Sequence, residues 1–437
     1  MKEQMKTVLL TLLVAASLVQ SYLLANSSPQ YDSVVPTPTD YVESEWKGTR
    51  LELDTMIYPE DILIHFENGE NTILYPQMTF YRMIMEVVQQ RAFDGIRLTD
   101  RPPSALQHGT AGSLGLEMRF GSGLPMSVLQ ETMQLSGENI PEQLLVNRLV
   151  LSSQVDREEV RVYLVDDQEG SVYEATRADL TARDIERFVG FGSAQPRYTL
   201  DSGDIYVPAE PLPIIRYRMS YREFTAEQLQ RSLFPDPFNT RNLRERNGSQ
   251  IYTDGKRGLQ LSADQRWMSY TDPAAPVEGN VDPVNTALSA VQFVNRHGGW
   301  NGDYQLSEMA HAMSVGDQRT LVFRQYIGTY QGAYPIVSVT GALPFGTMRL
   351  TLQNGVVTAY ERSLLQLDSS WVREEVSLPG GNELLSRLST VKRTVLVDRL
   401  FPAYQLRIDG EEAVLHPMWV IQLADGTYEA LPGGGAF

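Results

Sequence analysis

The 437-residue chain contains no cysteine. This absence excludes disulfide bonds, thiolate zinc sites, cysteine nucleophiles and an anchor built on a lipid-modified cysteine. Histidine is scarce as well, because only five are present: His65, His108, His297, His311 and His416. Histidine is the commonest metal ligand and a frequent general base. The composition therefore leaves few residues from which a catalytic or metal site could be assembled.

The sequence motifs of common enzymes are missing or incomplete. The chain has no Gly-Lys-Ser/Thr phosphate loop and no Gly-x-Ser-x-Gly elbow. Glu308 and His311 form one Glu-x-x-His pair, which on a helix could place two ligands on one face, but a dinuclear site needs a second pair. Ser389 and Lys392 match Ser-x-x-Lys without the Ser-Asp-Asn and Lys-Thr-Gly segments of penicillin-recognising enzymes. We therefore expect no catalytic residue, no cofactor-binding residue and no metal ligand.

Positive charge is in deficit, with 37 Lys and Arg against 54 Asp and Glu and a net charge of −17. Such a surface repels phosphate backbones, so nucleic acid is not an expected partner. Lys2 and Lys6 precede an apolar run, and no further Lys or Arg occurs before Lys47. This asymmetry predicts that the N-terminus stays in the cytoplasm and that the remainder lies outside.

The apolar run from Thr7 to Ala25 reads TVLLTLLVAASLVQSYLLA and has 19 residues. A helix of this length, at about 1.5 Å per residue, spans about one hydrocarbon core. A signal peptide has a shorter apolar core that ends in a small-x-small cleavage site. The Val14-Ala15-Ala16 site instead lies inside the run. We therefore predict a cytoplasmic head, 1–6, and one retained transmembrane helix, 7–25. The alternative is a cleaved signal and a secreted protein.

Five polar residues lie within this run: Thr7, Thr11, Ser17, Gln20 and Ser21. Lipid offers no water to hydrogen-bond, so such side chains favour contact with a partner helix. At about 100° per residue, Thr7, Thr11 and Ser21 share one face, whereas Gln20 points elsewhere. We predict that the five residues contact partner helices on two sides. The alternative is that these polar residues make no such contact, since small and hydroxylated residues are ordinary in membrane helices.

Beyond the run, the sequence divides into a linker and three expected domains. Residues 26–45 carry three prolines and many small polar residues, which favours an extended linker. Boundaries are expected where Gly and Pro cluster, which gives an N-terminal domain (46–195), a middle domain (196–280) and a C-terminal domain (281–437).

Turn and helix signals predict the α+β class. Five pairs suit type I′ hairpin turns and hence antiparallel sheets: Asn68-Gly69, Asp254-Gly255, Asn354-Gly355, Asp409-Gly410 and Asp425-Gly426. Periodicity, capping boxes and N-caps predict helices at 79–89, from Thr225 through Leu233, from Pro283 to Gly298, and around 382–393. The last two helices each precede a meander, so we expect a helix-plus-meander repeat within 281–437.

Several stretches resemble the YycH family. They are PQYD in the linker and, further on, SLFPDP, IYTDGKRGLQL, SYTDP, AVQFVNRHGGW, FRQYIGTYQGAYPI and VVTAYERSL. The resemblance covers nearly the whole chain and includes the order of a short head, one helix and a large cysteine-free outer portion. Members of this family are membrane-anchored proteins of low-GC Gram-positive bacteria. They act with a sister protein, YycI, on the essential sensor histidine kinase WalK (YycG), which controls cell-wall metabolism.

The resemblance implies about three extracytoplasmic α+β domains, no enzymatic activity and a single-pass location in the cell membrane. It also implies two partners, a sensor histidine kinase of WalK/YycG type and a YycI-like sister protein. It supplies no catalytic residues and leaves the sign of regulation open. The alternative is an anchored extracytoplasmic cell-wall enzyme or binding module. A wall hydrolase would need a carboxylate pair or a metal set, which the sequence does not show.

Overall fold

The computed structural model describes residues 48–106, 113–138, 140–141, 144–154, 159–273, 282–309, 318–339, 344–392, 395–424 and 426–435, with positions 4, 6, 13, 14, 17 and 20 near the N-terminus. The predicted linker lies outside these residues, as does most of the predicted membrane helix. No helix within the described residues is long and apolar enough to cross a membrane. The chain packs as two units, 1–40 and 41–437, and every sheet belongs to the second.

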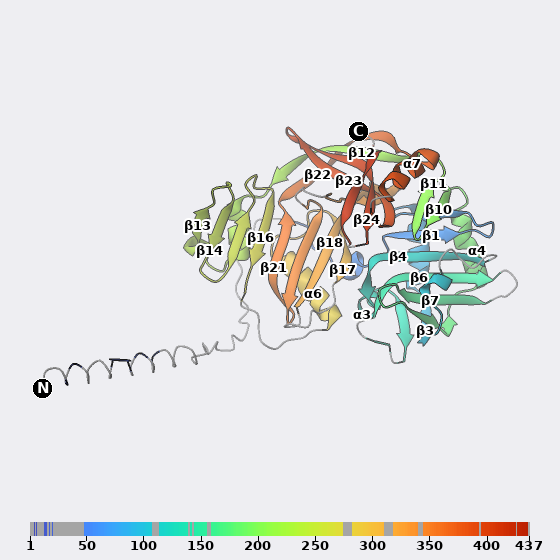
Figure 1. Cartoon of the computed structure of the whole chain (residues 1–437), viewed down its shortest axis with the longest axis horizontal. Helices are drawn as coiled ribbons and strands as arrows, with labels where there is room; N and C mark the ends of the chain where they lie inside the picture. The colour runs from blue at the N-terminus through green and yellow to red at the C-terminus, as the bar shows by residue number, and fades with distance from the viewer. Residues whose placement is uncertain are drawn as a thin grey trace. The chain divides into compact units, whose positions relative to one another are not determined.

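The first sheet of the described chain has eleven strands, in the order β11-β10-β2-β1-β4-β6-β7-β8-β3-β5, with β9 also on β3 (Figure 1). They are β1 Asp61–His65, β2 Asn71–Leu74, β3 Ala92–Thr99, β4 Ser113–Pro125, β5 Gln134–Gly137, β6 Leu145–Gln154, β7 Val160–Asp166, β8 Ser171–Ala175, β9 Arg177–Ala178, β10 Tyr198–Ser202 and β11 Ile205–Pro208. Helices α2 (Thr79–Gln89) and α4 (Ala182–Phe191) bury their apolar residues in the core on one face. Short helices η2 (Pro103–Ala105) and α3 (Met126–Leu129) complete this region.

The second sheet has nine described strands, in the order β13-β14-β15-β16-β21-β20-β18-β17, with β19 on β18. They are β13 Arg241–Arg244, β14 Gln250–Thr253, β15 Gly258–Leu261, β16 Trp267–Thr271, β17 Asp303–Met309, β18 Gln318–Thr329, β19 Gly332–Pro335, β20 Thr347–Gln353 and β21 Val356–Ser363. Helices α5 (Ala226–Leu233) and α6 (Pro283–Arg296) contribute to its core. The short helix η3 (Pro237–Asn239) leads into β13.

The third sheet has five described strands, in the order β22-β12-β24-β23, with β25 on β24. They are β12 Leu212–Glu223, β22 Leu365–Leu378, β23 Val397–Asp409, β24 Glu412–Leu423 and β25 Tyr428–Gly435, and α7 (Gly381–Lys392) lies beside β25. The chain leaves this sheet after β12, forms the second sheet, and returns as β22. The boundaries expected near 195 and 280 therefore do not coincide with the limits of the sheets.

The predicted α+β class with mainly antiparallel sheets is confirmed. Antiparallel strands flank all five predicted turns, although Asp425 itself lies outside the described residues. Asn354 and Gly355 both have positive φ, at 49° and 78°, as a type I′ turn requires. At the turns of Asn68, Asp254 and Asp409 only the glycine does, so the type I′ prediction is wrong at these three turns. Glycine accepts this conformation because it has no Cβ.

The predicted helices form, and α5 and α6 begin at the capping residues that the sequence indicated. The Thr225 side chain accepts a bond from the Gln228 backbone at 3.3 Å, and Asp282 accepts one from the Asn285 backbone at 2.9 Å. Helix α4 was not predicted, although its capping box of Thr181 and Asp184 is visible in the sequence. The helices of the expected repeat, α6 and α7, precede meanders that lie in different sheets.

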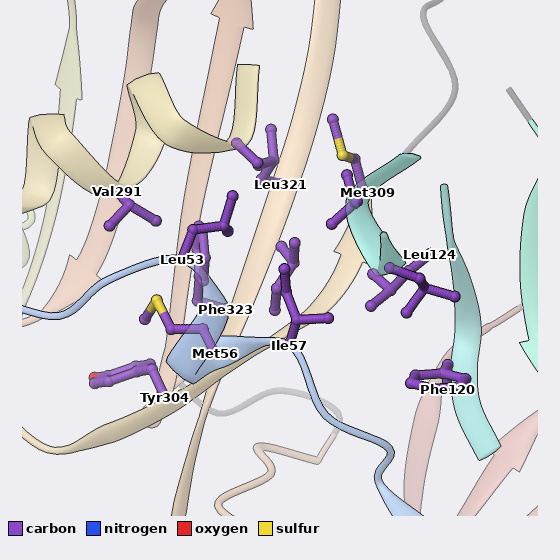
Figure 2. Packing of buried hydrophobic residues seen from close by; sticks show 14 of the residues in the cluster. Leu53, Met56, Ile57, Phe120, Leu124, Val291, Tyr304, Met309, Leu321 and Phe323 are labelled. Carbon is purple, nitrogen blue, oxygen red and sulfur yellow. The ribbon is translucent and has the colours of Figure 1, made fainter. Parts of the chain in front are cut away.

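One apolar core joins the first sheet to the second. Leu53, Met56 and Ile57, in and beside the short helix η1 (Asp54–Met56), belong to the same buried cluster as Phe120 of β4 and Phe323 of β18 (Figure 2). These side chains are almost fully buried. Burying a side chain of this size contributes about 1.5–3 kcal/mol. The segment before β1 thus holds the two sheets together.

A chain of tyrosine rings joins all three sheets. Tyr75, directly after β2, packs against Tyr334 of β19 with ring centroids 4.9 Å apart. Tyr334 contacts Tyr404 of β23 at 6.1 Å, and Tyr404 contacts Tyr217 of β12 at 5.7 Å. Tilted and edge-on pairs of this kind contribute about 0.5–1.5 kcal/mol each beyond their burial. The three sheets are therefore parts of one packed body.

This topology predicts whether a chain that begins at residue 281 can fold cooperatively. Such a chain keeps β22 and β24 but loses β12, which pairs with both of them. It also loses four strands of the second sheet, β13 to β16. We expect residues 281–437 to show no cooperative thermal transition by circular dichroism, whereas residues 46–437 melt cooperatively. A cooperative melt of the shorter chain would show that β12 is dispensable.

Candidate functional site: a buried charge network between two sheets

Two of the five residues predicted to contact partner helices lie within the described structure. Ser17 and Gln20 are helical and exposed. Thr7, Thr11 and Ser21 lie outside the described residues. The proposed contacts of all five with partner helices stay a prediction.

The enzyme-like fragments of the sequence have ordinary structural partners. Ser389 donates from Oγ to the backbone oxygen of Ser386 at 2.8 Å, while Lys392 forms an ion pair with Asp201. The lysine is therefore engaged with β10 and not with the serine. Glu308 lies on strand β17 rather than on a helix, where it pairs with Arg324 at 2.9 Å. Its motif partner, His311, lies outside the described residues.

Within the described residues, no group of three or more His, Asp or Glu side chains is arranged to hold a metal. The most unusual chemistry is instead a set of buried charges on the first sheet. Asp61 of β1 lies opposite Arg119 of β4, and Glu117 lies two residues along on the same face. All three are at most 4% exposed. A buried charge costs several kcal/mol unless it is paired, so the partners of these groups matter.

Asp61 is held by two guanidinium groups from different sheets. Arg119 Nε donates to Asp61 Oδ1 at 2.5 Å, and Arg399 Nη2, from β23, donates to Asp61 Oδ2 at 2.5 Å. Arg399 also pairs with Glu60, and Arg119 with Asp204 at 3.2 Å. Burial alone would raise the pKa of Asp61, but the two arginines outweigh it and lower the pKa. Arg399 thereby ties the third sheet to the first.

Glu117 is the centre of the second half of the network. It accepts from His65 Nε2 at 3.0 Å and from Arg148 Nη1 at 3.4 Å. Burial tends to raise the pKa of Glu117, but the hydrogen bond and charge of His65, with the charge of Arg148, lower it to about 2. Arg148 also binds Asp167 through two bonds, at 2.8 and 3.0 Å. Glu117 therefore stays ionised inside the protein.

His65 is set up to carry a proton. Its Nδ1 donates to Asn71 Oδ1 at 2.7 Å while Nε2 donates to Glu117, so both ring nitrogens face acceptors. Burial tends to lower the pKa of His65, but the bond to Glu117 and its charge outweigh burial and raise the pKa. The imidazolium and the carboxylate thus stabilise each other in a site that excludes water.

Sequence reasoning did not find this network. The available signal is the even spacing of ionisable residues among apolar ones, with Asp61 and His65 in DILIH and an alternating pattern in LEMRF, from Leu116 to Phe120. In a strand, such alternation usually marks a solvated face. Here that face is covered, and Arg399 lies 338 residues away from Asp61 in sequence.

A cavity of about 480 Å³ lies where the three sheets meet. Its walls include Tyr58 and Arg82 from the first region, Asp303 and Tyr326 from the second sheet, and Trp371 from the third. The rings of Tyr58 and Tyr326 meet edge-on at 6.0 Å. Because helix α2, the segment before β1 and strands of the second and third sheets all line this cavity, its volume depends on how these parts are packed.

The network predicts that Arg399 is essential for stability. Arg399→Met leaves Asp61 and Glu60 with one cation fewer, and breaking a buried pair typically costs about 3–5 kcal/mol. The matched control is Arg349→Met, which breaks an exposed pair with Glu361 and should cost about 0–1 kcal/mol. Urea unfolding of the two variants gives both values. Equal losses would mean that Arg399 is no more than a surface arginine.

The direction of the His65 pKa shift also predicts a pH dependence. A raised pKa gives stabilisation that is complete below pH 6.5 and is lost as the pH rises through the folded-state value. The gap in unfolding free energy between the native chain and His65→Gln should therefore narrow as the pH rises. His297 is the opposite control, because burial lowers its pKa to about 4. The difference in unfolding free energy between the native chain and His297→Gln should narrow as the pH falls from 6.5 to 4. If the difference between the native chain and His65→Gln widens as the pH rises, the pKa of His65 is not raised in the folded protein.

Known proteins resemble this chain along nearly all of its length. The Two-component system WalR/WalK regulatory protein YycH of Bacillus subtilis (strain 168) is 23% identical over 445 residues, which cover 97% of this chain and 95% of that protein. The crystal structure of YycH from Bacillus subtilis matches with a TM-score of 0.67 at 20% identity, covering 88% of this chain and 98% of that chain. This structural likeness shows a shared fold.

Family models match both halves of the chain. The model of the YycH protein N-terminal domain matches residues 3–189, and that of the YycH protein C-terminal domain matches residues 202–432. The residues between the two matches, 190–201, include the last two residues of helix α4 and all of β10 except Ser202. The resemblance seen in the sequence is thereby confirmed, and the chain belongs to the YycH family.

Proposed function

We propose that this chain is a membrane-anchored, extracytoplasmic accessory regulator of a two-component sensor histidine kinase of WalK/YycG type, without enzymatic activity of its own. The observation that carries the proposal is the match to a protein named as a WalR/WalK regulatory protein across 97% of this chain. The kinase and a YycI-like sister protein are the proposed partners, and control of cell-wall metabolism is the proposed outcome.

Three features support a place at the membrane. The run from Thr7 to Ala25 has the length of one hydrocarbon core. Lys2 and Lys6 precede it, and no Lys or Arg follows it before Lys47. The match to the family's N-terminal domain begins at residue 3 and so includes this run. A retained helix would hold the outer body, 41–437, beside the membrane segments of its partners.

The packing of the outer body suits a protein that acts by contact. Two apolar cores, the tyrosine chain and the Arg399–Asp61 pair join its three sheets. A surface on any one sheet is thus held in a defined position relative to the others. A regulator that binds a kinase both in and beside the membrane requires such a body, because loosely joined parts would lose the geometry of the second contact.

The proposed membrane contacts predict the effect of an exchanged anchor. Replacing Thr7 to Ala25 by a plain Leu/Ala helix should leave export and outer folding intact but remove most kinase regulation. Gln20→Leu alone should weaken it, because a hydrogen bond between membrane helices contributes about 0.6 kcal/mol on average. The measurement is the output of a kinase-dependent reporter gene at matched protein levels.

Gln20→Asn is the matched control, since it keeps a side-chain amide at the same position. It should regulate better than Gln20→Leu. If the Leu/Ala anchor regulates as well as the native one, the helix is a tether and the contacts with partners lie in the outer body.

A further inference from the structure

Strand β13 forms an open edge of the second sheet. It is the terminal strand in the sheet order, and its four residues, Arg241 to Arg244, are all exposed. Figure 1 shows it at the end of the sheet opposite β17. A terminal strand presents backbone N–H and C=O groups that can pair with another chain.

The register of the hairpin identifies which groups face outward. Glu245 N donates to the backbone oxygen of Ser249 at 2.9 Å, so its N–H points toward β14. The pairing of β13 with β14 runs without a bulge. Because N–H directions alternate along an antiparallel strand, the N–H groups of Asn242 and Arg244 point to the open edge.

Two large exposed apolar side chains belong to this strand and to the turn directly before it. Phe238 is 92% exposed, the highest value among the large hydrophobic side chains of the described residues, and Leu243 is 55% exposed. The turn that carries Phe238 is held by two local bonds: Asp236 accepts from the Phe238 backbone at 3.2 Å, and Thr240 donates to the Pro237 oxygen at 2.9 Å. Phe238 is therefore presented to solvent by an ordered turn.

The same segment is locally basic in a chain of net charge −17. Arg241, Arg244 and Arg246 form no ion pair with any residue that the structure describes. Other arginines of this sheet are paired, such as Arg257 with Asp272 at 2.7 Å. The intervening Glu245 is engaged by Ser249 within its own hairpin. The three guanidinium groups are thus available to carboxylates of another molecule.

We propose that β13 and Phe238 form a docking edge for an acidic, extended segment of a partner protein, which adds to the second sheet as a further strand. The outward N–H groups would pair with its backbone, the arginines with its carboxylates, and Phe238 would be the apolar anchor. The inference rests on the proposed function, because it names the kind of partner segment that a contact regulator would bind on this sheet.

The charges disfavour a second copy of this chain as the occupant. A second copy would bring an identical edge, which carries three arginines and one glutamate between Arg241 and Arg246, so like charges would gather there. Two copies of a chain of net charge −17 also repel each other. A lipid surface could take up Phe238 and the arginines, but it cannot pair with the outward N–H groups.

The test uses the full chain in detergent with co-expressed kinase and sister protein. Asn242→Pro removes an outward N–H without removing a bond to β14, and proline is tolerated at such edge positions. Arg244→Glu reverses one charge of the edge, and Arg183→Glu, at an exposed position of α4, is its matched control. We expect both edge variants to retain partner proteins at least about tenfold more weakly, with melting unchanged, and the control to match the native chain.

A photo-crosslinking amino acid at position 238, compared with one at 183, identifies the occupant. We expect crosslinks from 238 to an acidic segment of a partner protein and none from 183. Unchanged retention by both edge variants, with no crosslink from 238, would overturn the docking edge while the native chain still retains the kinase. Binding to phosphatidylglycerol vesicles that Arg244→Glu abolishes, without protein crosslinks, would also overturn it. Failure of the native chain to retain any partner would instead contradict the proposed function.

Discussion

The carboxylate of Asp61 can stay charged inside this protein only because two arginines reach it, Arg119 from its own sheet and Arg399 from another. The cost of burying these charges is recovered only when the first and third sheets are packed together. The network therefore makes the arrangement of the sheets specific, while the apolar cores and the tyrosine chain supply most of the attraction. A body built in this way keeps its surfaces in fixed relation.

That fixed relation gives the proposed function its physical basis. A regulator that works by contact alone must make differential contacts with the states of its partner. Such contacts need a rigid body that keeps its structure on binding. They also need an anchor that holds this body close to a membrane kinase. The open edge at β13 lies on the second sheet, whose core is continuous with that of the first. Binding at the proposed docking edge would therefore act on a sheet that is packed against the rest of the body.

Sequence reasoning reached the features that are determined by near neighbours. The capping box of Thr225 and Gln228 and the turn at Asn354 and Gly355 lie within a few residues, so their geometry can be read locally. The insertion of the second sheet between β12 and β22, and the pairing of Arg399 with Asp61, join residues far apart in the chain. The composition of neither segment identifies the strand or residue with which it pairs. Periodicity could group Thr7, Thr11 and Ser21 on one helix face, but the residues that they are proposed to contact belong to other proteins.

The central claim is that the chain works by binding a sensor kinase and not by acting on the cell wall. The most direct measurement is purification of the full-length chain from membranes in mild detergent, followed by identification of what remains bound. The account predicts that the sensor histidine kinase and the sister protein co-purify in stable amounts. A chain that retains neither partner but binds or cleaves cell-wall material would contradict it.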